Sequence, residues 1–299
     1  MTDTEHALVG NHLADKVRRR RLLEQTVSPL PANPRVITVS NQKGGVGKTT
    51  TTVNLASALA RRGANVLVID LDPQGNASTA LGVPHRPEVT SVYDVLLGER
   101  EIEEAVQPST DHENLFCVPS TINLAGAEIE LVSLVAREQR LRTALEGFLG
   151  RSERPFHYVF IDCPPSLGLL TVNAFVAAQE VLIPIQCEYY ALEGLSQLLG
   201  NIQLIQKHLN PTLRVSTILL TMYDARTNLA QEVAGEVREH FPAETLRAVV
   251  PRSVRVSEAP SYGQTVHAYD QASIGALAYL EAAAEIAERG APTHPHEGA

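Results

Sequence analysis

The sequence contains no tryptophan, and its aromatic residues make up only 5% of 299 residues. Hydrophobic residues nevertheless account for 44% of the chain, so its apolar content comes mostly from alanine, valine, leucine and isoleucine. Aliphatic side chains of this kind are typical of helices packed on a parallel sheet. The composition therefore predicts a sizeable hydrophobic core in an α/β fold.

Cysteine is also scarce, with Cys117, Cys163 and Cys187 far apart along the chain. An odd number of widely spaced cysteines argues against a disulfide framework or a zinc site and favours a reducing cytoplasm. No run of about 18 apolar residues occurs, which predicts that no segment spans a membrane. No apolar stretch follows the first charged residues, so no signal peptide is expected.

Positive charge is in deficit, because 25 Lys and Arg stand against 34 Asp and Glu, for a formal net charge of −9. This argues against a protein coated in basic surface but allows a local basic patch. The segment 1–34 carries the run KVRRRR and ends in the proline-rich SPLPANP. We expect a flexible basic arm, with a short helix over about residues 6–24. Whether the arm contacts nucleic acid, contacts an anchoring protein or presents a solvated helix face stays open.

Short apolar segments alternate with helical patterns between the two ends of the chain. Strands are expected at 35–40, 64–70, 114–119, 157–165, 180–186, 214–224 and 244–250. Helices are expected at 49–63, 125–149, 191–208, 228–240 and 271–288. The alternation predicts one α/β domain over 35–288, with a doubly wound, mostly parallel sheet flanked by helices, and a disordered tail at 289–299.

A glycine-rich segment, NQKGGVGKTT at residues 41–50, follows the first expected strand and opens a helix. Glycines let the backbone curl so that its N–H groups point at phosphate oxygens, and the helix dipole adds to that field. Lys48 is expected to reach the β- and γ-phosphates, and the Thr49 hydroxyl to ligate Mg²⁺. The pattern predicts a phosphate-loop nucleotide site made by Gly44, Gly45, Val46, Gly47, Lys48, Thr49 and Thr50.

Acidic residues lie where two of the expected strands end. Asp162 closes HYVFIDCPP, as expected of the acid that holds the Mg²⁺ shell in phosphate-loop enzymes. Asp70 and Asp72 follow another strand in IDLDPQGNAS, and one of them is suited to orient the attacking water. Strand alternation places these two on the same side, so their spacing does not choose between them.

Six segments in order resemble the ParA/Soj family of deviant Walker-type ATPases. They are KGGVGKTT, IDLDPQGNAS, IDCPPS, PIQCEYYALEGLSQL, LTMYDARTNLAQEV and PRSVRVSEAPSYGQTV. The resemblance covers about residues 35–285. It implies a Mg²⁺-dependent ATPase that forms an ATP-dependent homodimer and moves chromosome or plasmid DNA with a centromere-binding ParB protein. It also implies a cytoplasmic protein associated with the nucleoid.

The same resemblance assigns roles to individual residues. Lys43, which follows Gln42 where the general loop pattern has glycine, matches a lysine that touches the phosphates bound by the partner subunit. Asp72 matches the residue that polarises the attacking water, and Pro251 lies in a segment that closes over the adenine. The implied catalytic residues are Lys43, Lys48 and Asp72. The resemblance also adds Lys43 and Pro251 to the ATP-binding residues. The implied metal site consists of Thr49, Asp70 and Asp162.

Three arginines are candidates for DNA contact. Arg226 matches a family position implicated in DNA binding, and Arg252 and Arg255 lie in or beside a similarly implicated region. Non-specific DNA affinity depends on clustered positive charge rather than on total charge. The alternative is that these arginines form surface salt bridges with Glu232, Glu236 or Glu258.

Other proteins with this loop remain as alternatives. A MinD-like ATPase that positions a membrane or other cargo predicts a basic amphipathic C-terminal helix, whereas LEAAAEIAERGAPTHPHEGA is alanine-rich and acidic. A nitrogenase-reductase-like carrier needs paired cluster-binding cysteines, and the cysteines here are expected to be small buried residues. A nucleotide-gated scaffold without catalysis lacks a competent water-positioning acid, which Asp72 supplies.

Overall fold

An eight-stranded sheet forms the centre of the protein in a computed structural model that describes residues 15–23, 25–189 and 191–291. The strand order is β3-β4-β2-β5-β1-β6-β7-β8, and every neighbouring pair is parallel except β3 with β4. The strands are β1 (Arg35–Val39), β2 (Val66–Asp70), β3 (Gln107–Pro108), β4 (Leu115–Val118), β5 (Tyr158–Asp162), β6 (Glu180–Gln186), β7 (Arg214–Tyr223) and β8 (Thr245–Pro251). The predicted single, mostly parallel sheet is confirmed.

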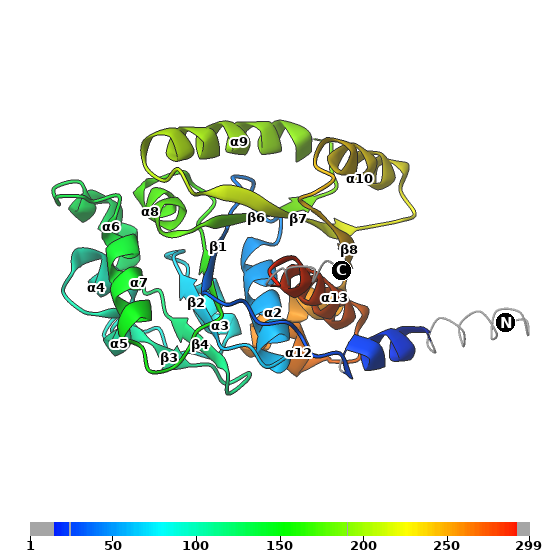
Figure 1. Ribbon diagram of the computed structural model, residues 1–299, viewed down its shortest axis with the longest axis horizontal. Coiled ribbons are helices and arrows are strands. Elements are labelled where there is room, and N and C mark those ends of the chain that lie inside the picture. The colour runs from blue at the N-terminus through cyan, green and yellow to red at the C-terminus, as the bar shows by residue number, and fades with distance from the viewer. Residues whose placement is uncertain (1–14, 24, 190, 292–299) are drawn as a thin grey trace, which may run out of the picture.

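Helices cover both faces of this sheet (Figure 1). Alternate strand residues enter two separate cores: Val36 packs with α4–α10 on one face, while Ile37 packs with α2, α3 and α11–α13 on the other. This sorting follows from the two-residue repeat of a strand. The helices are α2 (Lys48–Arg61), α3 (Asn76–Ala80), α4 (Val92–Leu97), α5 (Ile102–Ala105), α6 (Leu124–Leu131), α7 (Arg140–Arg151), α8 (Leu169–Ala177), α9 (Ala191–His208), α10 (Asn228–His240), α11 (Val254–Glu258), the 3₁₀ turn η1 (Ala259–Tyr262), α12 (Val266–Tyr269) and α13 (Ile274–Arg289).

The single helix expected at 125–149 is wrong, because the chain there forms α6 and α7 with a break between them. Ala136 in the break has a φ of 51°. Asn173 of α8 stabilises the interruption, since its Nδ2 donates to the Arg137 carbonyl over 2.8 Å and its Oδ1 accepts from Leu141 N over 3.2 Å. A side chain that arrives from another helix therefore competes with the helical hydrogen bonds at this point.

The expected basic arm is described from residue 15 on, and residues 15–23 are helical. The Arg62 side chain donates to Ser28 Oγ over 2.8 Å and to two backbone carbonyls of the same segment. Arg19 forms an ion pair with Glu281 of α13. This part of the arm therefore packs against α2 and α13. The earlier part of the helix expected from residue 6 lies outside the described residues, as does most of the expected C-terminal tail.

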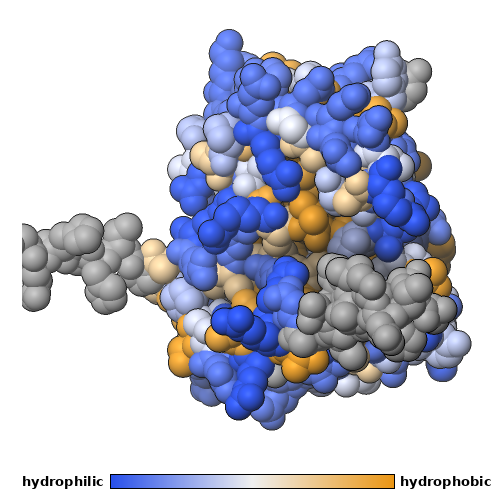
Figure 2. All heavy atoms as spheres, turned by 90° about the vertical axis from the view of Figure 1, so that its right-hand side faces the viewer, coloured by the Kyte–Doolittle hydropathy of each residue, from blue (hydrophilic) through white to orange (hydrophobic). Residues whose placement is uncertain are grey.

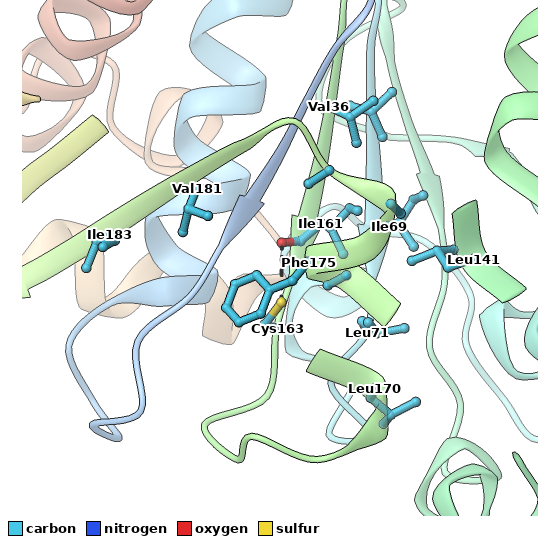
Figure 3. Packing of buried hydrophobic residues seen from close by; sticks show 14 of the residues in the cluster. Val36, Ile69, Leu71, Leu141, Ile161, Cys163, Leu170, Phe175, Val181 and Ile183 are labelled. Carbon is cyan, nitrogen blue, oxygen red and sulfur yellow. Dashed lines mark hydrogen bonds between the residues drawn. The ribbon is translucent and has the colours of Figure 1, made fainter. Parts of the chain in front are cut away.

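The three cysteines are buried and unpaired. Cys163 lies among apolar side chains beside Phe175 (Figure 3). Burial raises the pKa of Cys163 to about 12 and that of Cys187 to about 11. These thiols are therefore neutral core residues, as expected. Among the described residues, no helix combines the length and apolar character needed to cross a membrane.

Candidate nucleotide site

The glycine loop joins β1 to α2 at the carboxyl ends of the parallel strands, where ligands bind in sheets of this type. Gly45 and Gly47 have φ values of 76° and 90°, which residues with a side chain rarely adopt. A Cβ placed on Gly44 or Gly45 meets no heavy atom within 4 Å. No side chain caps the start of α2 at Gly47. Open space next to uncapped N–H groups is what a phosphate group requires.

Lys48 and Val46 fix the loop from inside. Lys48 is only 8% exposed, and its Nζ donates to the Lys43 carbonyl over 3.3 Å. Burial lowers the pKa of Lys48, while the nearby carboxylates of Asp162 and Asp72 act in the opposite direction. The Val46 side chain is buried, and its carbonyl accepts from Thr221 Oγ1 of β7 over 2.8 Å. Thr50 follows within the first turn of α2.

The hydroxyl of Thr49 meets Asp162, as a magnesium site of this class requires. Thr49 Oγ1 donates to Asp162 Oδ2 over 2.7 Å, and Thr52 Oγ1 donates to Oδ1 over 3.0 Å. Burial, with the added charge of Asp70, raises the pKa of Asp162 to about 8 although both hydroxyls act in the opposite direction. A cation would relieve this concentration of negative charge. The donor set fits Mg²⁺, which prefers few protein oxygens together with phosphate oxygens and water.

Asp70 stands next to Asp162, because the two residues are partners in the register of β2 and β5. Both oxygens of its buried carboxylate are engaged: Oδ2 accepts from Ser78 N over 2.8 Å and from Ser78 Oγ over 2.6 Å, and Oδ1 accepts from Asp72 N over 3.2 Å. Burial raises the pKa of Asp70 to about 6. Asp70 therefore anchors the loop that carries Asp72, and its expected support of the metal site stays a prediction.

Asp72 is nearly buried, at 9% exposed, in the turn after β2. Its Oδ1 accepts from Gln74 N over 3.0 Å, and its carbonyl accepts from Gly75 N over 2.9 Å. These two bonds fix the turn and the direction of the side chain. Its charge contributes to the pKa shifts of both Lys48 and Asp162. The structure thus brings Asp72, Lys48 and Asp162 into one electrostatic group.

Lys43 points away from its own glycine loop. Its Nζ donates to Glu188 Oε2, in the turn after β6, over 2.6 Å. The Lys43 side chain is 38% exposed and the Glu188 side chain 46% exposed. The sequence did not identify Glu188 as a site residue, although it stands inside the segment PIQCEYYALEGLSQL. The pattern showed a family segment there but not which residue faces the loop.

Pro251 ends β8 and is the register partner of Tyr223 in β7. The neighbouring Met222 reaches the site, since its methyl carbon lies 4.0 Å from a Cβ placed on Gly47. The end of β8 is thus one strand beyond the strand that touches the glycine loop. The expected contact of Pro251 with adenine stays a prediction.

The structure separates the three candidate DNA-binding arginines into two groups. Arg226 is 89% exposed and pairs with Asp224 over 2.7 Å, and the backbone of Arg252 donates to Tyr223 O over 3.3 Å beside it. Their charges act together on Asp224, whose pKa is lowered first by the side-chain hydrogen bond from Arg226. Arg255, on α11, pairs instead with Glu258 over 3.2 Å and with Asp270 over 3.4 Å.

The comparisons with known proteins decide the family. A family model described as an AAA domain matches residues 34–215. The sporulation initiation inhibitor protein Soj of Bacillus subtilis is 51% identical over 256 residues, which cover 86% of this chain and 99% of that protein. The chain belongs to the ParA/Soj family of chromosome-partitioning ATPases. The predicted resemblance and the predicted ATPase class are confirmed.

A second partitioning protein agrees with this assignment, and a solved structure agrees with the fold. The chromosome partitioning protein ParA of Caulobacter vibrioides is 50% identical over 261 residues, covering 87% of this chain and 97% of that protein. A solved structure from Mycobacterium smegmatis, named cobyrinic acid a,c-diamide synthase and holding an ATP analog and magnesium, is 38% identical with a TM-score of 0.71. It covers 84% of this chain and 93% of that chain. This chain is therefore a partition ATPase with the phosphate-loop fold.

Proposed function

We propose that this chain is a DNA-segregation switch whose ATP-bound sandwich dimer binds DNA non-specifically. Hydrolysis, stimulated by a ParB-type centromere-binding protein, returns monomers that release the DNA. The observation that carries the proposal is the pair of lysines on one loop: Lys48 is buried inside the loop, while the partly exposed side chain of Lys43 is directed out of it, to Glu188. One lysine serves its own nucleotide, and the other is available to a second subunit.

Nucleotide binding follows from the loop geometry. The N–H groups around Gly44, Gly45 and Gly47 hold the phosphates of ATP, and Lys48 pairs with their terminal oxygens. Thr49 supplies its hydroxyl to Mg²⁺, and Asp162 orients that hydroxyl and adds negative charge behind it. When bound, the ion neutralises charge that develops on the transferred phosphoryl group. Asp72, held by its turn, orients the attacking water.

Dimerisation completes the site. Lys43 of each subunit extends to the phosphates bound by the partner, so that two chains enclose two ATP molecules. A cation supplied in trans stabilises the transition-state charge, as an arginine finger does. The state of the nucleotide therefore determines the state of the dimer.

DNA binding follows from the exposed arginines at the ends of β7 and β8. Arg226 and Arg252 lie close together, and a dimer presents two copies of this pair, which raises the number of DNA phosphates that it neutralises. The face at the β8 edge of the sheet is covered mainly by hydrophilic side chains (Figure 2). Arg255 is the weaker candidate, because two carboxylates already pair with it. The resulting protein is cytoplasmic and nucleoid-associated.

DNA co-sedimentation of the wild type and of Asp72→Ala, with ATP, ADP or no nucleotide, tests the switch. We expect salt-sensitive DNA binding with ATP alone, because binding to phosphates releases counterions. Asp72→Ala should hold DNA longer after a single addition of ATP, since it binds nucleotide without hydrolysing it. Binding that ignores the nucleotide would contradict the proposal. ATP-driven dimers that bind no DNA would instead favour a MinD-like ATPase with another cargo.

Arg226→Ala tests the DNA surface separately. We expect the variant to bind all DNA sequences more weakly, and the slope of log affinity against log salt to fall by about 1 for each DNA phosphate that is no longer neutralised. Arg142→Ala is the matched control, because Arg142 also pairs with an exposed carboxylate, that of Glu146 on α7. Both variants should retain ATP-dependent dimerisation. Equal DNA affinities of the two variants would exclude Arg226 from the DNA surface.

A further inference from the structure

We propose that Glu188 is a positioning residue that holds Lys43 within its own subunit until two ATP-bound chains meet. It thereby sets how readily the lysine transfers to the nucleotide of the partner. This inference rests on the proposed function, because it concerns the same lysine and the same dimer. We refer to the contact of Lys43 with Glu188 as the cis ion pair.

The cis ion pair joins two loops that are adjacent in space and far apart in sequence. Lys43 follows β1 and Glu188 follows β6, and these strands pair with each other in the sheet. The 2.6 Å separation of Lys43 Nζ and Glu188 Oε2 is that of a charge-assisted hydrogen bond. Both side chains are more than a third exposed, so the pair is able to open without a change in the core.

The Glu188 carboxylate is held in place by its own turn. Its Oε1 accepts from the Gln186 side chain, and Glu188 N donates to the Gln186 carbonyl over 2.8 Å. The Glu188 carbonyl accepts from Ala191 N, at the start of α9, over 2.9 Å. One carboxylate oxygen is thus occupied by Gln186 and the other by Lys43. Gln186 therefore holds the carboxylate that accepts from Lys43.

The backbone of the lysine is tied to the same strand. Asn41 Nδ2 donates to the Pro184 carbonyl of β6 over 2.8 Å, and Asn41 Oδ1 accepts from Lys43 N over 3.0 Å. The base of the Lys43 side chain is therefore fixed, while its ammonium is able to bind either of two acceptors. Those acceptors are the Glu188 carboxylate in the same chain and the phosphates of a partner.

A lysine that pairs within its own chain must lose that partner before it crosses the interface. The fraction of chains with a free Lys43 then limits the apparent affinity of dimerisation. An ion pair as exposed as this one contributes modestly, so it biases the equilibrium and does not block it. Removal of the carboxylate should strengthen ATP-dependent dimerisation by about 2- to 5-fold.

Glu188→Gln, made in the Asp72→Ala chain so that ATP persists, tests this inference. The measurement is the protein concentration at half-dimerisation with saturating ATP, by analytical ultracentrifugation at low and high salt. We expect this concentration to fall by about 2- to 5-fold at low salt and the difference from the parent to shrink at high salt, because exposed charges are screened. Glu193→Gln, an exposed glutamate in the first turn of α9, should behave as the parent.

The outcomes separate the two proposals. A parent chain that does not dimerise with ATP overturns the proposed function, and the role of Glu188 fails with it. If the parent dimerises and Glu188→Gln shows the same midpoint or a weaker dimer, only the cis ion pair is overturned. In a Lys43→Ala background, Glu188→Gln should change nothing further, since the two residues act through each other. If Glu188→Gln still strengthens dimerisation as much in the Lys43→Ala background, the proposal is also overturned.

Discussion

Lys43→Ala is expected to lower the ATP turnover seen with DNA and a ParB-type protein by about 10³-fold or more, which is the effect of removing a cation supplied in trans. Nucleotide binding should change little, because the loop and Lys48 remain in place. Lys43 contributes to its own loop through backbone atoms, which alanine keeps. Its ammonium donates instead to the Glu188 carboxylate. The measurement is single-turnover hydrolysis together with binding of a fluorescent ATP analog.

Two variants control this experiment. Lys207→Ala removes an exposed lysine in the last turn of α9 and should leave turnover unchanged. Mixing Lys43→Ala with Asp72→Ala should restore part of the activity, because in a mixed dimer one site retains Asp72 and receives Lys43 from the partner. Turnover that is equal in Lys43→Ala and wild type would show that this lysine does not act across the interface. A loss of nucleotide binding in Lys43→Ala would instead place it within its own site.

Most of the fold could be predicted because its strands are buried on both faces. Segments such as EVLIPIQ read as continuous apolar runs, and the bounds expected for β6 agree with the structure. The break between α6 and α7 could not be predicted, since it depends on Asn173, which arrives from α8. The two-residue strand β3 and the short helices between β2 and β4 carried too few residues to show a periodic pattern.

The nucleotide site was predictable where chemistry requires a fixed spacing along the chain. The glycines, Lys48 and Thr49 occur within one loop, and Asp162 ends a buried strand. Contacts between distant segments left no such signal. The ion pair of Lys43 with Glu188 and the attachment of Asp70 to Ser78 depend on strand order and on turn geometry. Sequence spacing does not report either of these.

Glu180→Ala is expected to destabilise the protein by about 3–5 kcal/mol, because it leaves a buried arginine without its counter-ion. Glu180 is 4% exposed and Arg35 12% exposed at the side chain, at the end of the sheet opposite the glycine loop. Arg35 Nε and Nη2 each donate to the carboxylate over 2.8 Å, and Nη1 donates to the Ile286 carbonyl over 2.7 Å. The pair thus connects β1, β6 and α13. Urea unfolding with Mg²⁺ and ADP absent measures the loss.

Glu146→Ala is the control, since Glu146 belongs to an exposed pair with Arg142 and should cost less than about 1 kcal/mol.

The pH dependence gives an independent check. Burial acts to raise the pKa of Glu180. The hydrogen bonds and charge of Arg35, together with Ser216 and Arg214, outweigh burial and lower this pKa below its usual 4.5. A carboxyl whose pKa is lowered on folding stabilises the protein above its unfolded pKa, and this stability is lost as the pH falls through the folded value. The difference in the free energy of unfolding between wild type and Glu180→Ala should therefore be constant near neutral pH and shrink only below about pH 4.5. If this difference in unfolding free energy already shrinks between pH 7 and pH 6, groups other than Glu180 are responsible for it.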